Sequence, residues 1–144
     1  MHDNIIIDTS VLIALEKCDL LNILCNIYKT VIVMEAVIAE FGEINLPCMK
    51  VENISSPILN LLMNTVNLGK GEAQVIAYAL NAKEIPVLLD DLKSRKIAKN
   101  MDITVSGTIG LLIKAQKKGL IESAYKRANI LKEKGFYISE KLLK

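Results

Sequence analysis

Short apolar runs with little polar alternation recur along the chain and predict buried strands. Residues 4–8, 31–34 and 87–90 have this pattern, since each consists mainly of isoleucine, valine or leucine. Strands covered on both faces of a parallel sheet show such near-continuous apolar runs. A short strand is also expected at 103–105, and an edge strand at 49–54, where apolar and polar residues alternate imperfectly.

Between these runs, apolar residues recur at the spacing of an α-helix. The clearest helix is 71–82, in which Val75 and Ala79 lie beside Ile76 and Leu80 on one face. Other helices are expected at 11–17, 19–26, 35–42, 57–65, 93–100, about 107–118 and 121–134. Strands that alternate with helices predict an α/β fold, in which helices cover both faces of a parallel sheet.

The composition fits a single globular domain that spans residues 1–144. A chain of this length can bury a sizeable core, and 51% of its residues are hydrophobic, which argues against disorder. No apolar run is long enough to cross a membrane, and the N-terminus lacks the features of a secretory signal. A cytoplasmic protein without membrane association is therefore expected. The net charge of +2 is too small to indicate nucleic-acid binding by itself.

The cysteines and the histidine argue against several kinds of site. Cys18, Cys25 and Cys48 are odd in number and include no C-x-x-C pair, so neither a disulfide framework nor a zinc ribbon is expected. Cys18 and Cys25 are interpreted as small core residues on one helix face. His2 is the single histidine and lies near the chain end, which argues against Ser-His and Cys-His catalysis.

Acidic residues fall where such a fold would bring them to one edge of the sheet. Asp8 ends the first strand, the pair Asp90 and Asp91 ends a later one, and Glu40 and Glu72 lie on helices. In open α/β sheets, ligands bind outside the carboxyl ends of the strands, where the strand order reverses. Carboxylates suit Mg²⁺ or Mn²⁺, and without a cation they repel one another. The arrangement therefore predicts metal-assisted chemistry on a phosphate-rich substrate.

Three of these acids also have an ordinary structural interpretation. Asp8 could cap the helix that follows it, although Thr9 or Ser10 could equally supply that cap. Glu72 lies in a first helical turn, where an acid complements the helix dipole, but it also heads the apolar stripe of its helix. Glu40 shares a helix face with apolar residues, and its position favours neither interpretation.

The acid pair is followed by a basic helix. Asp90 and Asp91 are adjacent on a strand and point to opposite sides, so one could bind a metal while the other caps the helix at 93–100. Asp91 is the favoured metal ligand of the pair, and Asp90 is a further candidate ligand beside Asp8 and Glu72. Lys93, Arg95 and Lys96 could contact RNA phosphates, which position a nucleic acid without reading its sequence. The alternative is an ordinary solvated helix face.

Several stretches, taken together, resemble the PIN-domain nucleases. They are residues 5–13 (IIIDTSVLI), 37–40 (VIAE), 69–76 (GKGEAQVI) and 87–91 (VLLDD). The later stretches 105–112 (VSGTIGLL) and 134–139 (KGFYIS) look like one solitary prokaryotic subfamily of uncharacterised members. The resemblance extends over almost the whole chain, and the ordered set of acid motifs carries it.

The resemblance implies both a fold and an activity. The fold is a PIN-like three-layer α/β/α arrangement with a parallel five-stranded sheet, and the activity is Mg²⁺- or Mn²⁺-dependent cleavage of single-stranded RNA. Carried over by position, the acids are Asp8, Glu40, Glu72 and Asp91, and a hydroxyl of Thr9 or Ser10 would help to hold the site. Many members are toxins of toxin–antitoxin pairs, which implies a homodimer and an antitoxin partner.

The chain departs from the toxin pattern at two positions. Toxin members commonly carry aspartate in place of Glu72, and often threonine or serine in place of Leu89. A second hypothesis is therefore a PIN-like binding module that holds RNA or a protein with little or no metal. A third is a phosphotransfer protein, but Ser10 stands where dehalogenase-like phosphatases need an aspartate, and the acid pair comes too late for a receiver domain.

Overall fold

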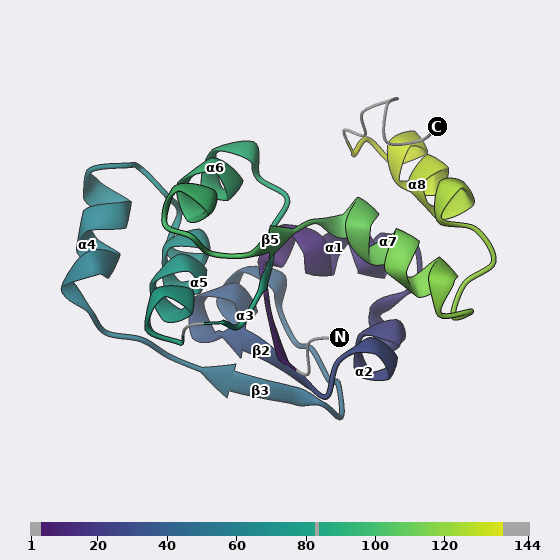
Figure 1. Ribbon diagram of the computed structural model, residues 1–144, viewed down its shortest axis with the longest axis horizontal. Helices are drawn as coiled ribbons and strands as arrows, with labels where there is room; N and C mark the ends of the chain where they lie inside the picture. Colours follow the sequence, from purple (N-terminus) through teal and green to yellow (C-terminus); the bar gives the residue numbers. More distant parts are fainter. Residues whose placement is uncertain (1–3, 83, 137–144) are drawn as a thin grey trace.

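The computed structural model describes residues 4–82 and 84–136, which form a sheet of five parallel strands (Figure 1). The strands are β1 (Asn4–Ile7), β2 (Thr30–Met34), β3 (Met49–Glu52), β4 (Val87–Leu88) and β5 (Val105–Ser106). Their spatial order is β3-β2-β1-β4-β5, so β1 lies at the centre and β3 at an edge, as the sequence predicts. Ile6 pairs with Ile32 of β2 on one side and with Val87 of β4 on the other.

Helices follow each strand and agree closely with the expected ranges. They are α1 (Thr9–Lys17), the 3₁₀ helix η1 (Leu21–Ile23), α2 (Leu24–Ile27), α3 (Glu35–Phe41), α4 (Pro57–Asn64), α5 (Lys70–Asn81), α6 (Leu92–Asn100), α7 (Thr108–Lys117) and α8 (Ala124–Glu133). The helix expected at 19–26 is divided between η1 and α2. Ser56 caps α4 by accepting a hydrogen bond from Ile58 N. His2 and the last three residues of the stretch 134–139 lie outside the described residues.

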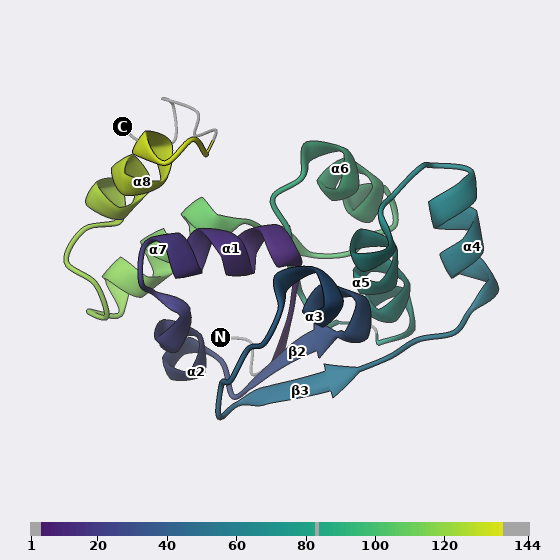
Figure 2. The same ribbon diagram turned by 180° about the vertical axis from the view of Figure 1, so that it is seen from behind.

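The sheet lies between helices, which completes a three-layer α/β/α arrangement. The opposite views of Figures 1 and 2 bring α6 and α7 toward one viewer and α1 and α3 toward the other. Contacts run from α1 to α3 and from α3 to α5, and α5 also packs on β1 and β2. The predicted fold class is therefore confirmed.

The three isoleucines of the central strand are buried, and the strand order reverses beside it. Ile5, Ile6 and Ile7 are at most 2% exposed, which explains why β1 has no polar alternation. The chain places β2 and β3 on one side of β1, and then β4 and β5 on the other. Such a reversal leaves a crevice at the carboxyl ends of the two strands that flank it, here β1 and β4.

Two strand boundaries differ from the prediction for a local reason. β4 ends at Leu88 rather than at residue 90, because Asp91 turns to cap α6 and Asp90 turns to the start of α7. β5 lies at 105–106 rather than at 103–105, because the Ile103 N–H instead donates to Ala98 O and closes α6. In both cases, residues that the apolar pattern assigned to a strand form hydrogen bonds with the end of a helix instead.

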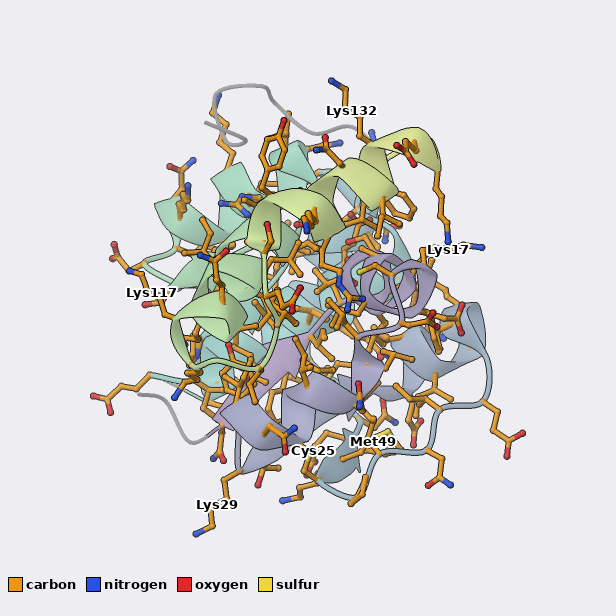
Figure 3. All side chains as sticks on the ribbon, turned by 90° about the vertical axis from the view of Figure 1, so that its right-hand side faces the viewer. Lys17, Cys25, Lys29, Met49, Lys117 and Lys132 are labelled. Carbon is orange, nitrogen blue, oxygen red and sulfur yellow. A yellow bond between two sulfur atoms is a disulfide. The ribbon has the colours of Figure 1, made fainter. Side chains whose placement is uncertain are left out.

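The cysteine prediction was wrong for two residues. Cys25 of α2 and Cys48, just before β3, form a disulfide with a Cα–Cα distance of 5.6 Å. Figure 3 labels Cys25 and Met49, the residue that follows Cys48. The two residues are 23 positions apart, and only the packing of α2 beside the start of β3 brings them together. Cys18 is free and buried, as predicted.

No helix within the described ranges has the length and apolar character needed to span a membrane.

Candidate acid site

Asp8 lies at the carboxyl end of the central strand. Its backbone N–H donates to Leu88 O at 3.0 Å, which joins the end of β1 to the end of β4. The residue is 3% exposed, and Ser10 Oγ donates to its Oδ2 at 3.4 Å. Asp8 occupies the cap position of α1, but its side chain makes no capping hydrogen bond. The interpretation of Asp8 as a mere helix cap therefore lacks support.

The surroundings of Asp8 disfavour its charged form. Burial raises the pKa of the Asp8 carboxyl to about 7, although the Thr9 backbone N–H opposes this shift. The negative charges of Glu72 and Glu40 contribute to this raised value. A carboxylate in such a place is stabilised by a positively charged group, and a bound cation would supply one.

Glu72 is fixed through both of its carboxylate oxygens. It lies in the first turn of α5, where Oε1 accepts a hydrogen bond from Gly69 N at 3.2 Å. This bond supports the start of the helix, as the structural interpretation of Glu72 predicts. The other oxygen, Oε2, accepts from Ser94 Oγ at 2.8 Å and so faces α6. Glu72 therefore combines a capping role with a place in the acid cluster.

Asp91 caps α6 and meets the same serine. Its Oδ2 accepts hydrogen bonds from Ser94 N at 2.9 Å and from Ser94 Oγ at 2.7 Å. Partial burial raises the pKa of the Asp91 carboxyl, but the hydrogen bonds from Ser94 and the side-chain hydrogen bond with Glu72 outweigh it and hold the pKa below its ordinary value, helped by the charge of Lys93. Asp91 therefore stays ionised beside Glu72.

Ser94 is the residue of this site that the sequence interpretation missed. Its side chain is fully buried, and it belongs to a helix that the sequence marks mainly by its positive charge. A hydroxyl three residues after a helix-capping acid was the signal that could have identified it, since that spacing returns the side chain to the cap.

Asp90 has a structural partner for each carboxylate oxygen. Oδ1 accepts a hydrogen bond from Thr108 N at 2.8 Å, and Oδ2 accepts one from Thr108 Oγ1. Asp90 therefore joins the end of β4 to the first turn of α7. The prediction that one acid of the pair serves as a helix cap needs a correction, because Asp91 caps α6 and Asp90 holds α7. Asp91 remains the better candidate for the metal.

Glu40 is exposed and reaches the first turn of α5. A Cβ atom on Gly71 would collide with Glu40 Oε1, so the carboxylate lies directly over this glycine. Gln74 fixes the two helices to each other, because its buried Oε1 accepts a hydrogen bond from Ala36 N at 3.0 Å. Glu40 is thus close enough to Asp8 to raise its pKa, but it lies on the solvent side of the cluster.

The basic residues of α6 divide into two kinds. Arg95 is half-buried and donates to Leu89 O at 3.1 Å, so it secures α6 to the end of β4. Lys93 and Lys96 are exposed and free to meet a phosphate from solvent. The RNA-contact prediction therefore fits these two lysines best.

A cleft of about 880 Å³ lies beside the acids. Ser10 and Asp91 contribute to its lining, together with the cations Arg95 and Lys99. The remaining lining is largely apolar and includes Leu92, Ile113, Leu131 and Phe136. The cleft therefore reaches the acid pair Asp90 and Asp91, whereas Asp8, Glu40 and Glu72 do not line it.

The predicted metal ligands do not form a finished metal site. Among residues 4–82 and 84–136, no group of three or more His, Cys, Asp or Glu side chains is arranged to hold an ion. Glu72 links the two halves of the cluster, since it interacts electrostatically with Asp8 and shares Ser94 with Asp91.

The donor chemistry nevertheless fits a divalent cation. Ser94 has one hydroxyl proton but lies within hydrogen-bond distance of two carboxylates, so one of these contacts lacks a donor. Thr9 Oγ1, next to Asp8, is buried and has no hydrogen-bond partner in the described structure. Hard oxygen ligands with surplus negative charge suit Mg²⁺ or Mn²⁺. Asp8, Glu72 and Asp91 are the residues that would hold the ion.

Comparisons with known proteins gave one match. A family model described as "PIN domain" matches residues 4–144 of the chain. The comparisons with curated proteins and with solved structures found no match.

Proposed function

Because the chain belongs to the PIN-domain family, whose members are generally nucleases, we propose that it is a metal-dependent ribonuclease that cleaves single-stranded RNA. The observation that carries the proposal is the buried carboxyl of Asp8, which lies at the switch in strand order and has other acids as its charged neighbours. A protein keeps such an arrangement for function, since it disfavours the folded state.

Each acid has a separate part in the proposed site. Asp8 and Asp91, at the ends of β1 and β4, would be the main residues that hold a Mg²⁺ or Mn²⁺ ion, and Glu72 would complete the set of ligands. Glu40 adds charge from the solvent side. The hydroxyl of Ser10 orients Asp8 through its hydrogen bond to Oδ2. When bound, a divalent ion supplies Lewis acidity for hydrolysis of the phosphodiester bond.

The RNA is held by charge rather than by base recognition in this proposal. Lys93 and Lys96 contact phosphates on either side of the scissile bond, since both are exposed on the helix that Asp91 caps. A single strand suits the cleft better than a duplex, because a flexible backbone can follow the lining toward Asp91. The toxin role, the antitoxin and the homodimer implied by the family resemblance stay predictions.

The test is a cleavage assay on labelled single-stranded RNA with Mn²⁺, with Mg²⁺ and with EDTA. Wild type is expected to cut with either metal and not with EDTA. Asp8→Asn is expected to lose at least about 100-fold in rate, because loss of a metal ligand exceeds the effect of an outer-shell change. Asp90→Asn is the matched control, since it removes a neighbouring charge but retains the bond from Thr108 N, and it is expected to cleave nearly as wild type does.

Circular dichroism shows whether each variant is folded. Undiminished cleavage by a folded Asp8→Asn variant would contradict the proposal. RNA binding by wild type without cleavage under any metal condition would instead favour the binding module.

A further inference from the structure

The structure places one buried hydroxyl between two acids that come from different elements. Ser94 Oγ is 2.8 Å from Glu72 Oε2 on α5 and 2.7 Å from Asp91 Oδ2 at the start of α6. Ser94 itself has no exposed surface, whereas Asp91 is exposed and Glu72 is half-buried. The backbone N–H of Ser94 adds a third bond, to Asp91 Oδ2 at 2.9 Å.

These contacts leave the two carboxylates little freedom. Glu72 is held through Oε1 by Gly69 N and through Oε2 by Ser94. Asp91 is held by the N–H of Ser94, while the single hydroxyl proton of Ser94 can be donated either to Asp91 or to Glu72. Two like charges would otherwise separate, because carboxylates that face each other repel. The Ser94 hydroxyl lies between the two acids and can donate its one proton to either of them, which keeps both acids at one place.

We infer that Ser94 is a positioning residue for the cation of the acid site. This inference rests on the proposed function, since it assigns Ser94 to the same metal. Ser94 holds Glu72 and Asp91 together before the ion arrives, so that binding the ion needs little further ordering of side chains. Ser94 does not touch the substrate and acts through the two acids.

Loss of the hydroxyl should therefore weaken cation binding. Hydrogen bonds that orient metal ligands typically contribute about 10- to 100-fold in metal affinity. For Ser94→Ala we expect a reduction of about tenfold, at the lower end of this range, because Asp91 keeps its bond from the Ser94 backbone N–H. Cleavage should approach the wild-type rate once Mn²⁺ is saturating, since the acids themselves remain.

The experiment measures Mn²⁺ binding directly, by the electron paramagnetic resonance signal of the free ion in titrations without RNA. Ser123→Ala is the matched control, because Ser123 is also a helix-cap serine, with Oγ accepting from Lys126 N on α8, away from the acids. Both variants are expected to melt below wild type, since each loses a hydrogen bond within a helix cap. A weaker Mn²⁺ affinity is expected for Ser94→Ala alone.

Ser94→Cys keeps the size of the side chain but offers a weaker donor. It is expected to bind Mn²⁺ less tightly than wild type, and it replaces Ser94→Ala in the test if the alanine variant does not fold. Wild-type affinity in a folded Ser94 variant overturns the inference and leaves the proposed function intact. Absence of Mn²⁺ binding in wild type overturns both.

Discussion

At the scale of single residues, Asp8 is the clearest sign of a working site. Its carboxyl is buried at the end of the central strand, and its pKa of about 7 means that the folded protein favours the neutral form. In the unfolded chain the same group ionises near the ordinary value of 3.8. Folding therefore carries a penalty whenever the solution pH forces Asp8 to be charged.

This difference predicts how stability depends on pH in the absence of metal. Between about pH 4 and pH 7 the folded state binds a proton at Asp8 that the unfolded chain has released, so the free energy of unfolding falls as pH rises. Above pH 7 the loss levels off, at up to about 4 kcal/mol for a shift of this size. Urea unfolding in EDTA at a series of pH values measures it.

Asp8→Asn removes the titrating group and isolates its effect. The variant is expected to exceed wild type in stability at pH 8, and this advantage should shrink steadily toward pH 4. An advantage that is the same at both pH values would mean that the Asp8 pKa is not raised in the folded protein.

At the scale of elements, the apolar pattern predicts the helices and strands well and misses the connections between them. The end of β4 shows why. In the sequence, residues 89 and 90 continue the predicted strand, but in the structure β4 ends at Leu88 and Asp90 accepts a hydrogen bond from Thr108 of α7. The disulfide shows the same limit. The helix that contains Cys25 and the strand that follows Cys48 can each be predicted from the sequence. The spacing of the two cysteines does not show that α2 packs beside the start of β3.

The disulfide should stabilise the edge of the sheet. By the chain-entropy relation, a bridge between residues 23 positions apart contributes about 3 kcal/mol, because it restricts the unfolded chain. Reduction of wild type is therefore expected to lower the melting temperature, and a Cys25→Ser/Cys48→Ser variant should melt like reduced protein. Scanning calorimetry with and without dithiothreitol makes the measurement.

Cys18→Ala serves as the control, since Cys18 is buried but unpaired. Its melting temperature should keep the full dependence on dithiothreitol. If reduction left wild type unchanged, the bridge between α2 and β3 would contribute nothing to stability.

At the scale of the whole molecule, the strand order concentrates negative charge at one place. β1 and β4 are neighbours although about 80 residues of chain separate them, and their carboxyl ends bring Asp8 close to the start of α6. Helices α3 and α5 add Glu40 and Glu72 from the same side. A cation bound here would offset a repulsion that the entire fold creates.

Divalent metal is therefore expected to stabilise the folded protein. An ion at 100 times its dissociation constant adds about 2.7 kcal/mol, which corresponds to a rise of roughly 5–10 °C in melting temperature for a domain of this size. The rise should be larger at pH 8 than at pH 6, because more of Asp8 is ionised, and EDTA should reverse it. Thermal melting of wild type with Mn²⁺ provides the measurement.

Asp8→Asn/Asp91→Asn should show little of this rise, whereas Asp90→Asn should keep it. An equal rise in all three proteins would point to metal bound elsewhere on the surface.

Local sequence patterns were sufficient to predict the elements and the fold class, and they proposed which acids form the site. Periodicity and strand-end position depend on neighbouring residues, so Asp8, Glu72 and Asp91 can be found without a structure. The bonding partners of these side chains became known only from the tertiary structure, because hydrogen bonds between distant segments depend on packing. In the structure, Asp90 is hydrogen-bonded to α7, Cys25 is bonded to Cys48, and Ser94 lies between two acids. Contacts of this kind join residues about 20 positions apart, a distance over which a local pattern carries no information.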